Sequence, residues 1–156
     1  MTKLILSCIL CCSTLMISNE LHRRKVRLAD TVADLAEAIS RMITMLRFEA
    51  ADVYTLCREA FTDSFPAFRG ISSDFPSQWQ GACKTIQADS ETERLILLAG
   101  ETIGASDALS QCERLTLIRD DLRSHAESLK QKAMESKKLY TTLGAAAGFA
   151  AAIIMI

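Results

Sequence analysis

The stretch that decides the fold is Leu98-Ala99-Gly100-Glu101-Thr102-Ile103-Gly104-Ala105-Ser106-Asp107-Ala108-Leu109-Ser110-Gln111. Gly104 is placed to end one helix in a left-handed conformation, Ser106 to cap the next helix, and Asp107 to lie in its first turn. The second helix continues without a breaking residue into an apolar segment that reaches residue 156. The charged first part of this helix requires a solvent-exposed environment, whereas the apolar last part favours the interior of a lipid bilayer. This layout indicates a membrane-anchored assembly component rather than a soluble enzyme.

Composition sets the limits within which any fold must lie. The chain has 156 residues, 49% of them hydrophobic, with only two prolines and six glycines. That length allows one compact domain plus tails, and the composition excludes a disordered chain. The formal net charge is −1, so the chain as a whole lacks the basic footprint of a nucleic-acid-binding protein. We therefore expect no nucleic-acid partner.

Two uncharged apolar segments lie at the ends of the chain. Leu4–Ser18 has fifteen residues, and Leu139–Ile156 has eighteen. As helices they would extend roughly 22 Å and 27 Å, against a bilayer core of about 30 Å. We expect residues 1–20 to form a retained N-terminal anchor, with a cleaved signal peptide as the alternative. Residues 139–156 are expected to form a C-terminal transmembrane helix.

Basic residues flank both apolar segments on the side that faces the middle of the chain. Arg23-Arg24-Lys25-Val26-Arg27 follows the first segment, and the second is preceded by Lys130, Lys132, Lys137 and Lys138. Because positive flanks stay in the cytoplasm, residues 21–138 are predicted to be cytoplasmic, with both termini on the other side of the cell membrane. Within the second segment, Gly144 and Gly148 have the spacing of a helix-packing face. The alternative is that they only accompany an alanine-rich span.

The middle of the chain reads as an all-α domain. Apolar residues recur at helical spacing along two stretches. The first contains Leu28, Val32, Leu35, Ile39, Met42 and Leu46, and the second contains Leu115, Ile118, Leu122 and Leu129, with His125 on the same stripe. The first helix is predicted over residues 21–61, and a turn region over 63–76. Capping-box patterns at Ser77 and Ser90 predict two shorter helices, one carrying Trp79 and one ending at Ile103. The fold class expected is an antiparallel helical bundle between two membrane helices.

The antiparallel register predicts a specific polar contact. Matching Leu21 with Tyr140 at the membrane brings Glu49 level with about Cys112, so that Gln111 becomes its neighbour. A buried carboxylate without a partner is costly, and the Gln111 amide would supply a donor. The alternative is that Glu49 lies on the surface as a docking charge.

Chemistry-bearing patterns are not found in the sequence. His22 and His125 are the two histidines, and no nucleophilic triad order, metal-binding helix motif or phosphate loop accompanies them. The six cysteines show no metal spacing, and we expect reduced, buried thiols. The sequence therefore predicts a non-enzymatic protein with no cofactor and no metal site.

The chain resembles the stage III sporulation protein AB family over nearly its whole length. Three stretches carry the resemblance: Leu46-Arg47-Phe48-Glu49 with Thr55 and Glu59-Ala60, then Gly100 to Asp107 with Gln111, and finally Lys138-Leu139-Tyr140 with Leu143-Gly144 and Gly148. Trp79 also stands where the family tends to have tryptophan. Structural or interaction roles are therefore expected at Glu49, Trp79, Gly104, Ser106, Asp107 and Gln111.

The resemblance implies a function in endospore formation. The family is similar to the inner-membrane platform protein F of type II secretion, and its members are expected in the mother-cell membrane around the forespore. Expected partners are other stage III sporulation proteins, notably the AA ATPase, and self-association stays open. The alternative is a membrane-anchored helical adaptor or sensor outside any secretion machine.

Overall fold

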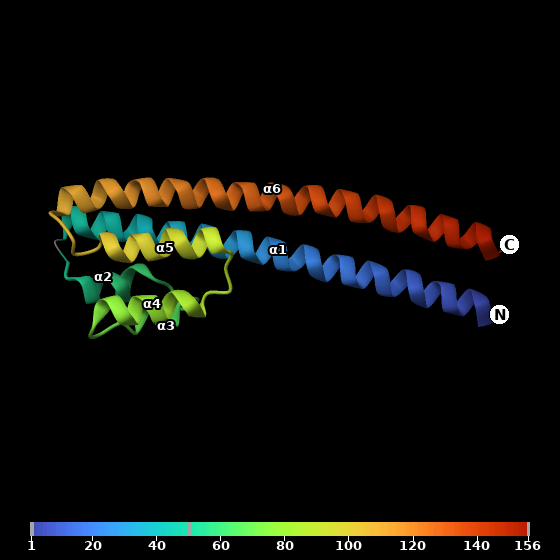
Figure 1. Ribbon diagram of the computed structural model, residues 1–156, viewed down its shortest axis with the longest axis horizontal. Coiled ribbons are helices and arrows are strands. Elements are labelled where there is room, and N and C mark those ends of the chain that lie inside the picture. The colour runs from blue at the N-terminus through green and yellow to red at the C-terminus, as the bar shows by residue number, and fades with distance from the viewer. Residues whose placement is uncertain (1, 50, 156) are drawn as a thin grey trace. The chain divides into compact units, whose positions relative to one another are not determined.

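The chain folds as helices connected by short loops. The computed structural model describes residues 2–49 and 51–155, with side chains at 16, 20, 22–49, 51–139 and 142. Within these residues the chain forms six helices and no strand (Figure 1): α1 (Thr2–Phe48), α2 (Val53–Ala60), α3 (Pro66–Arg69), α4 (Phe75–Thr85), α5 (Ser90–Thr102) and α6 (Ala108–Met155). The predicted all-α fold class is confirmed.

The chain divides into two compact units, each containing part of α1 and part of α6. Unit 1 comprises residues 1–27 and 128–156, and unit 2 comprises residues 28–127. In unit 2, the Cys112 thiol lies 3.7 Å from the carbonyl oxygen of Ile43, and Arg123 lies 3.9 Å from Glu37. Positions increase along α6 as they decrease along α1, so the two helices are antiparallel there, as predicted.

The two helices also contact each other within unit 1. His22 Nδ1 lies 3.2 Å from the carbonyl oxygen of Ala133, and Lys25 Nζ donates a hydrogen bond to Ser136 Oγ at 2.9 Å. Ala133 is fully buried. The small alanine side chain therefore allows the two helices to approach closely at this level.

The core of unit 2 includes most residues of the predicted apolar stripes, while Leu28, Leu46 and His125 of those stripes are half-buried. On α1, Val32, Leu35, Ile39 and Met42 have no exposed surface. The facing stripe of α6 contributes Leu115, Ile118 and Leu122, all buried. Removal of these side chains from water is the main stabilising contribution to a bundle of this kind.

The first helix ends earlier than the sequence analysis predicts. It stops at Phe48 rather than continuing to residue 61, and a separate helix, α2, begins at Val53. Asp52 caps α2 by accepting hydrogen bonds from the backbone amides of Tyr54 and Thr55. An aspartate is more favourable at a helix start than inside a helix. The chain therefore breaks here and turns into the small helices.

Helices α2, α3 and α4 pack through aromatic side chains. Phe61 stacks on Phe68 with ring centroids 4.6 Å apart, and Phe68 meets the edge of Trp79 at 4.9 Å. Phe65 and Phe75 complete the cluster. Pairs of this geometry contribute about 0.5–1.5 kcal/mol each beyond their buried area. The cluster holds three helices that are individually too short to be stable.

The starts of α4 and α5 also differ from the predicted capping boxes. Helix α4 begins at Phe75, so Ser77 lies inside it rather than at its cap. The Gln78 side chain accepts hydrogen bonds from the backbone amides of Ser72 and Ser73 in the preceding loop. Helix α5 begins at Ser90 and is capped by Asp89, one residue before the predicted position.

The three cysteines whose side chains are described match the prediction of buried thiols. Cys57, Cys83 and Cys112 are free and buried. Burial raises the pKa of Cys57 and of Cys83 to about 12, because a thiolate is poorly solvated there. Both thiols are therefore unreactive at neutral pH.

The predicted membrane segments fall almost wholly outside the described side chains. In the part of the chain that the structure describes, no helix combines the length and apolarity needed to cross a bilayer. For most of residues 4–18 and 139–156 the backbone is described but the side chains are not. The helix-packing prediction for Gly144 and Gly148 also lies outside the described residues.

Glycine at position 100 is required by the close packing of α4 on α5. A Cβ atom there would lie 2.8 Å from Trp79 Cε2 and closer still to Cδ1 and Nε1. Gly100→Ala should therefore destabilise the fold by about 1–3 kcal/mol, measured by urea unfolding with Trp79 fluorescence. Gly81→Ala is the matched control, because a Cβ there meets nothing within 4 Å. It should stabilise α4 by about 0.5–1 kcal/mol. Equal responses would contradict this packing.

Candidate functional site

The loop between α5 and α6 contains three of the predicted site residues, Gly104, Ser106 and Asp107. Helix α5 ends at Thr102, and Gly104 has a φ of +78°. This left-handed conformation is the one predicted for Gly104, and a residue with a side chain would be strained there by roughly 1–2 kcal/mol. The conformation reverses the chain and allows α6 to begin at Ala108.

Gln111 holds this turn from the first turn of α6. Its Oε1 accepts a hydrogen bond from the Gly104 amide at 3.1 Å, and its Nε2 donates to the Ser106 carbonyl oxygen. The side chain is only 7% exposed. Without this amide, two backbone groups next to the core would lose their partners, and an unsatisfied group of this kind is costly. Gln111 therefore has a structural function inside the turn.

The predicted contact between Glu49 and Gln111 is wrong. Glu49 follows the last residue of α1 and is exposed, so its carboxylate is solvated. Both functional atoms of the Gln111 amide bond to the turn instead. The prediction extended α1 past Phe48, and Glu49 would then have been part of the helix that faces α6. The alternative of Glu49 as a docking charge stays a prediction.

The residue that caps α6 is Asp107 rather than Ser106. The Asp107 carboxylate accepts hydrogen bonds from the Ser110 backbone amide at 3.1 Å and from the Ser110 hydroxyl at 2.8 Å. The bonds from the Ser110 side chain and backbone lower the pKa of Asp107. Ser106 contributes its carbonyl oxygen, which Gln111 binds. The prediction placed the cap one residue too early.

Trp79 packs on α5 and borders a groove next to the turn. Its indole N–H donates to the Ile96 carbonyl oxygen at 2.9 Å, and the side chain is 2% exposed. The groove, which we call the Trp79 groove, has a volume of about 330 Å³. Its lining consists of Phe75, Pro76, Trp79, Gln80, Leu97, Gly100, Glu101, Ile103, Gly104 and Ala105. Two predicted site residues, Trp79 and Gly104, thus meet here, although α4 and the turn are distant in sequence.

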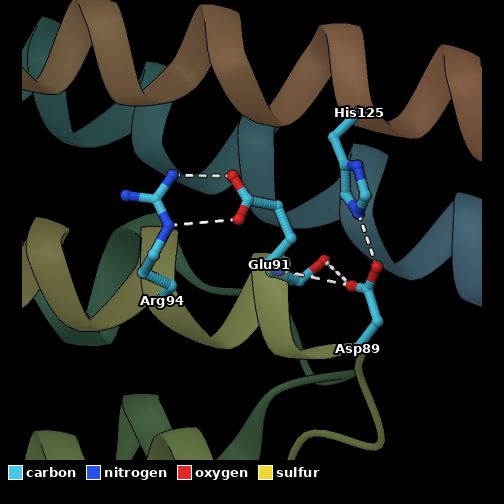
Figure 2. Close-up of polar contacts among 5 residues, drawn as sticks. Asp89, Glu91, Arg94 and His125 are labelled. Carbon is cyan, nitrogen blue, oxygen red and sulfur yellow. Dashed lines mark hydrogen bonds and ion pairs between the residues drawn. The ribbon is translucent and has the colours of Figure 1, made fainter.

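A second polar cluster, missed by the sequence analysis, joins the start of α5 to α6 (Figure 2). Asp89 Oδ2 lies 2.7 Å from His125 Nε2, while its Oδ1 accepts from the Thr92 backbone amide and hydroxyl. Beside it, Glu91 forms a two-bond ion pair with Arg94. The only sequence signal was the aspartate before Ser90, because pairing with His125 depends on the tertiary fold.

The electrostatics of Asp89 favour its charged form. Burial raises the pKa of Asp89, but hydrogen bonds from Thr92 and His125 lower it and outweigh burial. The net effect is a pKa below the ordinary value of an aspartate. One carboxylate therefore both caps α5 and connects it to α6.

The buried polar side chains of this region bond within the protein. Every buried side-chain nitrogen or oxygen atom in the described part of the chain has a hydrogen-bond partner. In the same part, no group of three or more His, Cys, Asp or Glu residues could hold a metal ion. The polar residues of the turn and of the Asp89 cluster are thus used in internal bonds.

The two candidate caps of α6 can be separated by substitution. Asp107→Ala removes the oxygens that bind Ser110, and should cost about 1 kcal/mol of unfolding free energy. Ser106→Ala keeps the carbonyl oxygen that Gln111 binds, and should cost less than about 0.5 kcal/mol. Urea unfolding of the two variants measures the difference. A larger loss in Ser106→Ala would contradict the assignment of the cap.

The two functions of Asp89 can also be separated. Asp89→Ala loses both the cap and the His125 contact and should cost about 1–2 kcal/mol, whereas Asp89→Asn keeps a good cap and should cost less. Because the pKa of Asp89 is lowered in the folded state, its charge stabilises the fold above the unfolded pKa. This contribution is lost as pH falls through the lowered pKa.

The stability gap between the wild-type chain and Asp89→Asn should therefore close under acidic conditions. Thermal unfolding across a pH series measures it. A gap that stays constant down to the acid limit would show that the charge of Asp89 does not contribute.

Comparison with known proteins identifies a matching family. The family described as stage III sporulation protein AB matches residues 3–156. No curated protein and no solved structure matches the chain. The family match confirms the resemblance that the Gly100–Gln111 stretch and its neighbours indicated.

Proposed function

The chain belongs to the stage III sporulation protein AB family, and we propose that it is a membrane platform component of a sporulation-specific export complex. Membership implies a role in sporulation, and proteins of this family are generally non-catalytic. In the proposal, residues 21–138 form a cytoplasmic helical domain, and the two apolar ends anchor it in the mother-cell membrane around the forespore. The expected partners are other stage III sporulation proteins, notably a cytoplasmic ATPase.

The observation that carries the proposal is the pairing within unit 1. His22 contacts Ala133, and Lys25 contacts Ser136. These contacts bring the basic flank of the first apolar segment level with the basic flank of the second. Two anchors entering a membrane from the same side require this arrangement, because both positive flanks must stay in the cytoplasm.

The internal bonding of unit 2 supports a scaffold rather than a catalyst. The residues of the most specific sequence motif, Gly104, Asp107 and Gln111, shape a turn that positions α5 against α6. A platform protein must present fixed surfaces to its partners, and rigid, fully bonded turns meet that need.

A cysteine-labelling experiment tests the proposed topology. Cys57, Cys83 and Cys112 are buried, so only Cys8, Cys11 and Cys12 need replacement by serine. A cysteine introduced at the exposed position Gln87 should react with a membrane-impermeant maleimide only after lysis of a bacterial host. A cysteine appended to the C-terminus should react in intact cells. Labelling of Gln87→Cys in intact cells would contradict a cytoplasmic domain.

Copurification separates the platform from the rival function. The rival is a free-standing membrane-anchored adaptor or sensor. From sporulating cells, the tagged chain should retain the family's cytoplasmic ATPase after detergent extraction. A chain that enters the membrane with the expected topology but never retains the ATPase would favour the adaptor.

A further inference from the structure

Charge is strongly separated between the two units. Residues 28–127 contain nine Lys and Arg against seventeen Asp and Glu, a formal net charge of −8. Unit 1, residues 1–27 and 128–156, contains nine basic residues against two acidic ones, a formal net charge of +7, and all of these except Lys3 lie in residues 20–27 and 128–139. The near-neutral total of −1 conceals this separation.

The basic residues of unit 1 form an exposed group, which we call the basic collar. Its members are Arg23, Arg24, Lys25, Arg27, Lys130, Lys132, Lys137 and Lys138, all exposed. They come from two helices that the His22 and Ser136 contacts hold side by side. The collar therefore combines positively charged side chains from α1 and from α6.

The local acidic groups do not neutralise the collar. Glu20 pairs with Arg24 at 3.5 Å and with Arg27 at 3.0 Å, and the two arginine side chains are 72% and 68% exposed. Exposed ion pairs of this kind are weak and easily exchanged. Glu135 is the other acidic residue, and it accepts a hydrogen bond from Gln131. Several cations thus stay accessible to an external anion.

The neighbouring sequence selects one kind of anionic partner. Uncharged segments of fifteen and eighteen residues adjoin the collar on both helices, at residues 4–18 and 139–156. A soluble polyanion such as RNA would gain nothing from these apolar neighbours, and the −8 charge of unit 2 would repel it. A bilayer surface offers phosphates directly beside hydrocarbon, which matches the collar and its neighbours together.

We propose that the basic collar binds the headgroups of anionic phospholipids. The inference rests on the proposed membrane location and adds a lipid preference to it. Juxtamembrane Lys and Arg residues attract anionic lipid within about one Debye length of the surface. Since unit 2 carries the opposite charge, the preference arises from the collar and not from the chain as a whole.

Lipid retention by the full chain tests the proposal. The purified chain is reconstituted into vesicles of phosphatidylcholine mixed with phosphatidylglycerol, then extracted gently, and the lipid that stays bound is quantified. The wild-type chain should enrich phosphatidylglycerol several-fold over the bulk composition. A collar variant, with Lys130, Lys132, Lys137 and Lys138 changed to Gln, should lose most of this enrichment.

A control variant of equal charge change isolates the collar. It changes Arg41, Arg58, Lys84 and Arg114, all exposed residues of unit 2, to Gln and should enrich phosphatidylglycerol as the wild-type chain does. Trp79 fluorescence melting should be unchanged in both variants. Equal enrichment in the collar variant and the wild-type chain, or RNA retention in place of lipid, would overturn the proposal. Flotation of the vesicles distinguishes failure of the membrane location from failure of the collar proposal. A chain that does not float with the vesicles refutes the membrane location. A chain that floats with them but does not enrich phosphatidylglycerol refutes only the lipid preference of the collar.

Discussion

The hydrogen bonds of the Gln111 side chain are the constraint on which the turn between α5 and α6 depends. The amide binds Gly104 and Ser106 at once, from a nearly buried position. Gly104 can adopt its left-handed conformation because it lacks a Cβ atom, but the side chain of Gln111 is what holds the backbone there. Asp107 then satisfies the open end of α6. The sequence motif is therefore a set of mutually dependent structural parts.

The second fixed point is the packing of Trp79 on α5. The indole can lie over Gly100 only because that residue has no side chain, and its N–H reaches the Ile96 carbonyl oxygen. The aromatic cluster then connects Trp79 to α2 and α3 through Phe61 and Phe68. In this way a glycine inside a helix, normally a destabilising choice, determines where three short helices lie.

The separation of charge gives the two units different physical environments. The acidic unit 2 exposes many carboxylates to solvent and contains an apolar core. The basic unit 1 contains both apolar segments, at residues 4–18 and 139–156. The family match places the role of the chain in sporulation. The same separation is the basis of the proposed lipid preference.

Helical periodicity and glycine chemistry are local properties, so the amino-acid sequence was enough to predict the all-α class, the antiparallel helix pair, most of the buried stripes and the left-handed Gly104. The predicted end of the first helix was wrong, since the apolar stripe continues past Phe48 while the cap at Asp52 competes with it. The partners of Gln111, the contact of Asp89 with His125, and the packing of Trp79 on Gly100 became visible only in the folded chain. Each of these depends on where a side chain's few donors and acceptors, or its ring, meet another element of the fold. The spacing of residues along the chain cannot specify which of these groups contact each other.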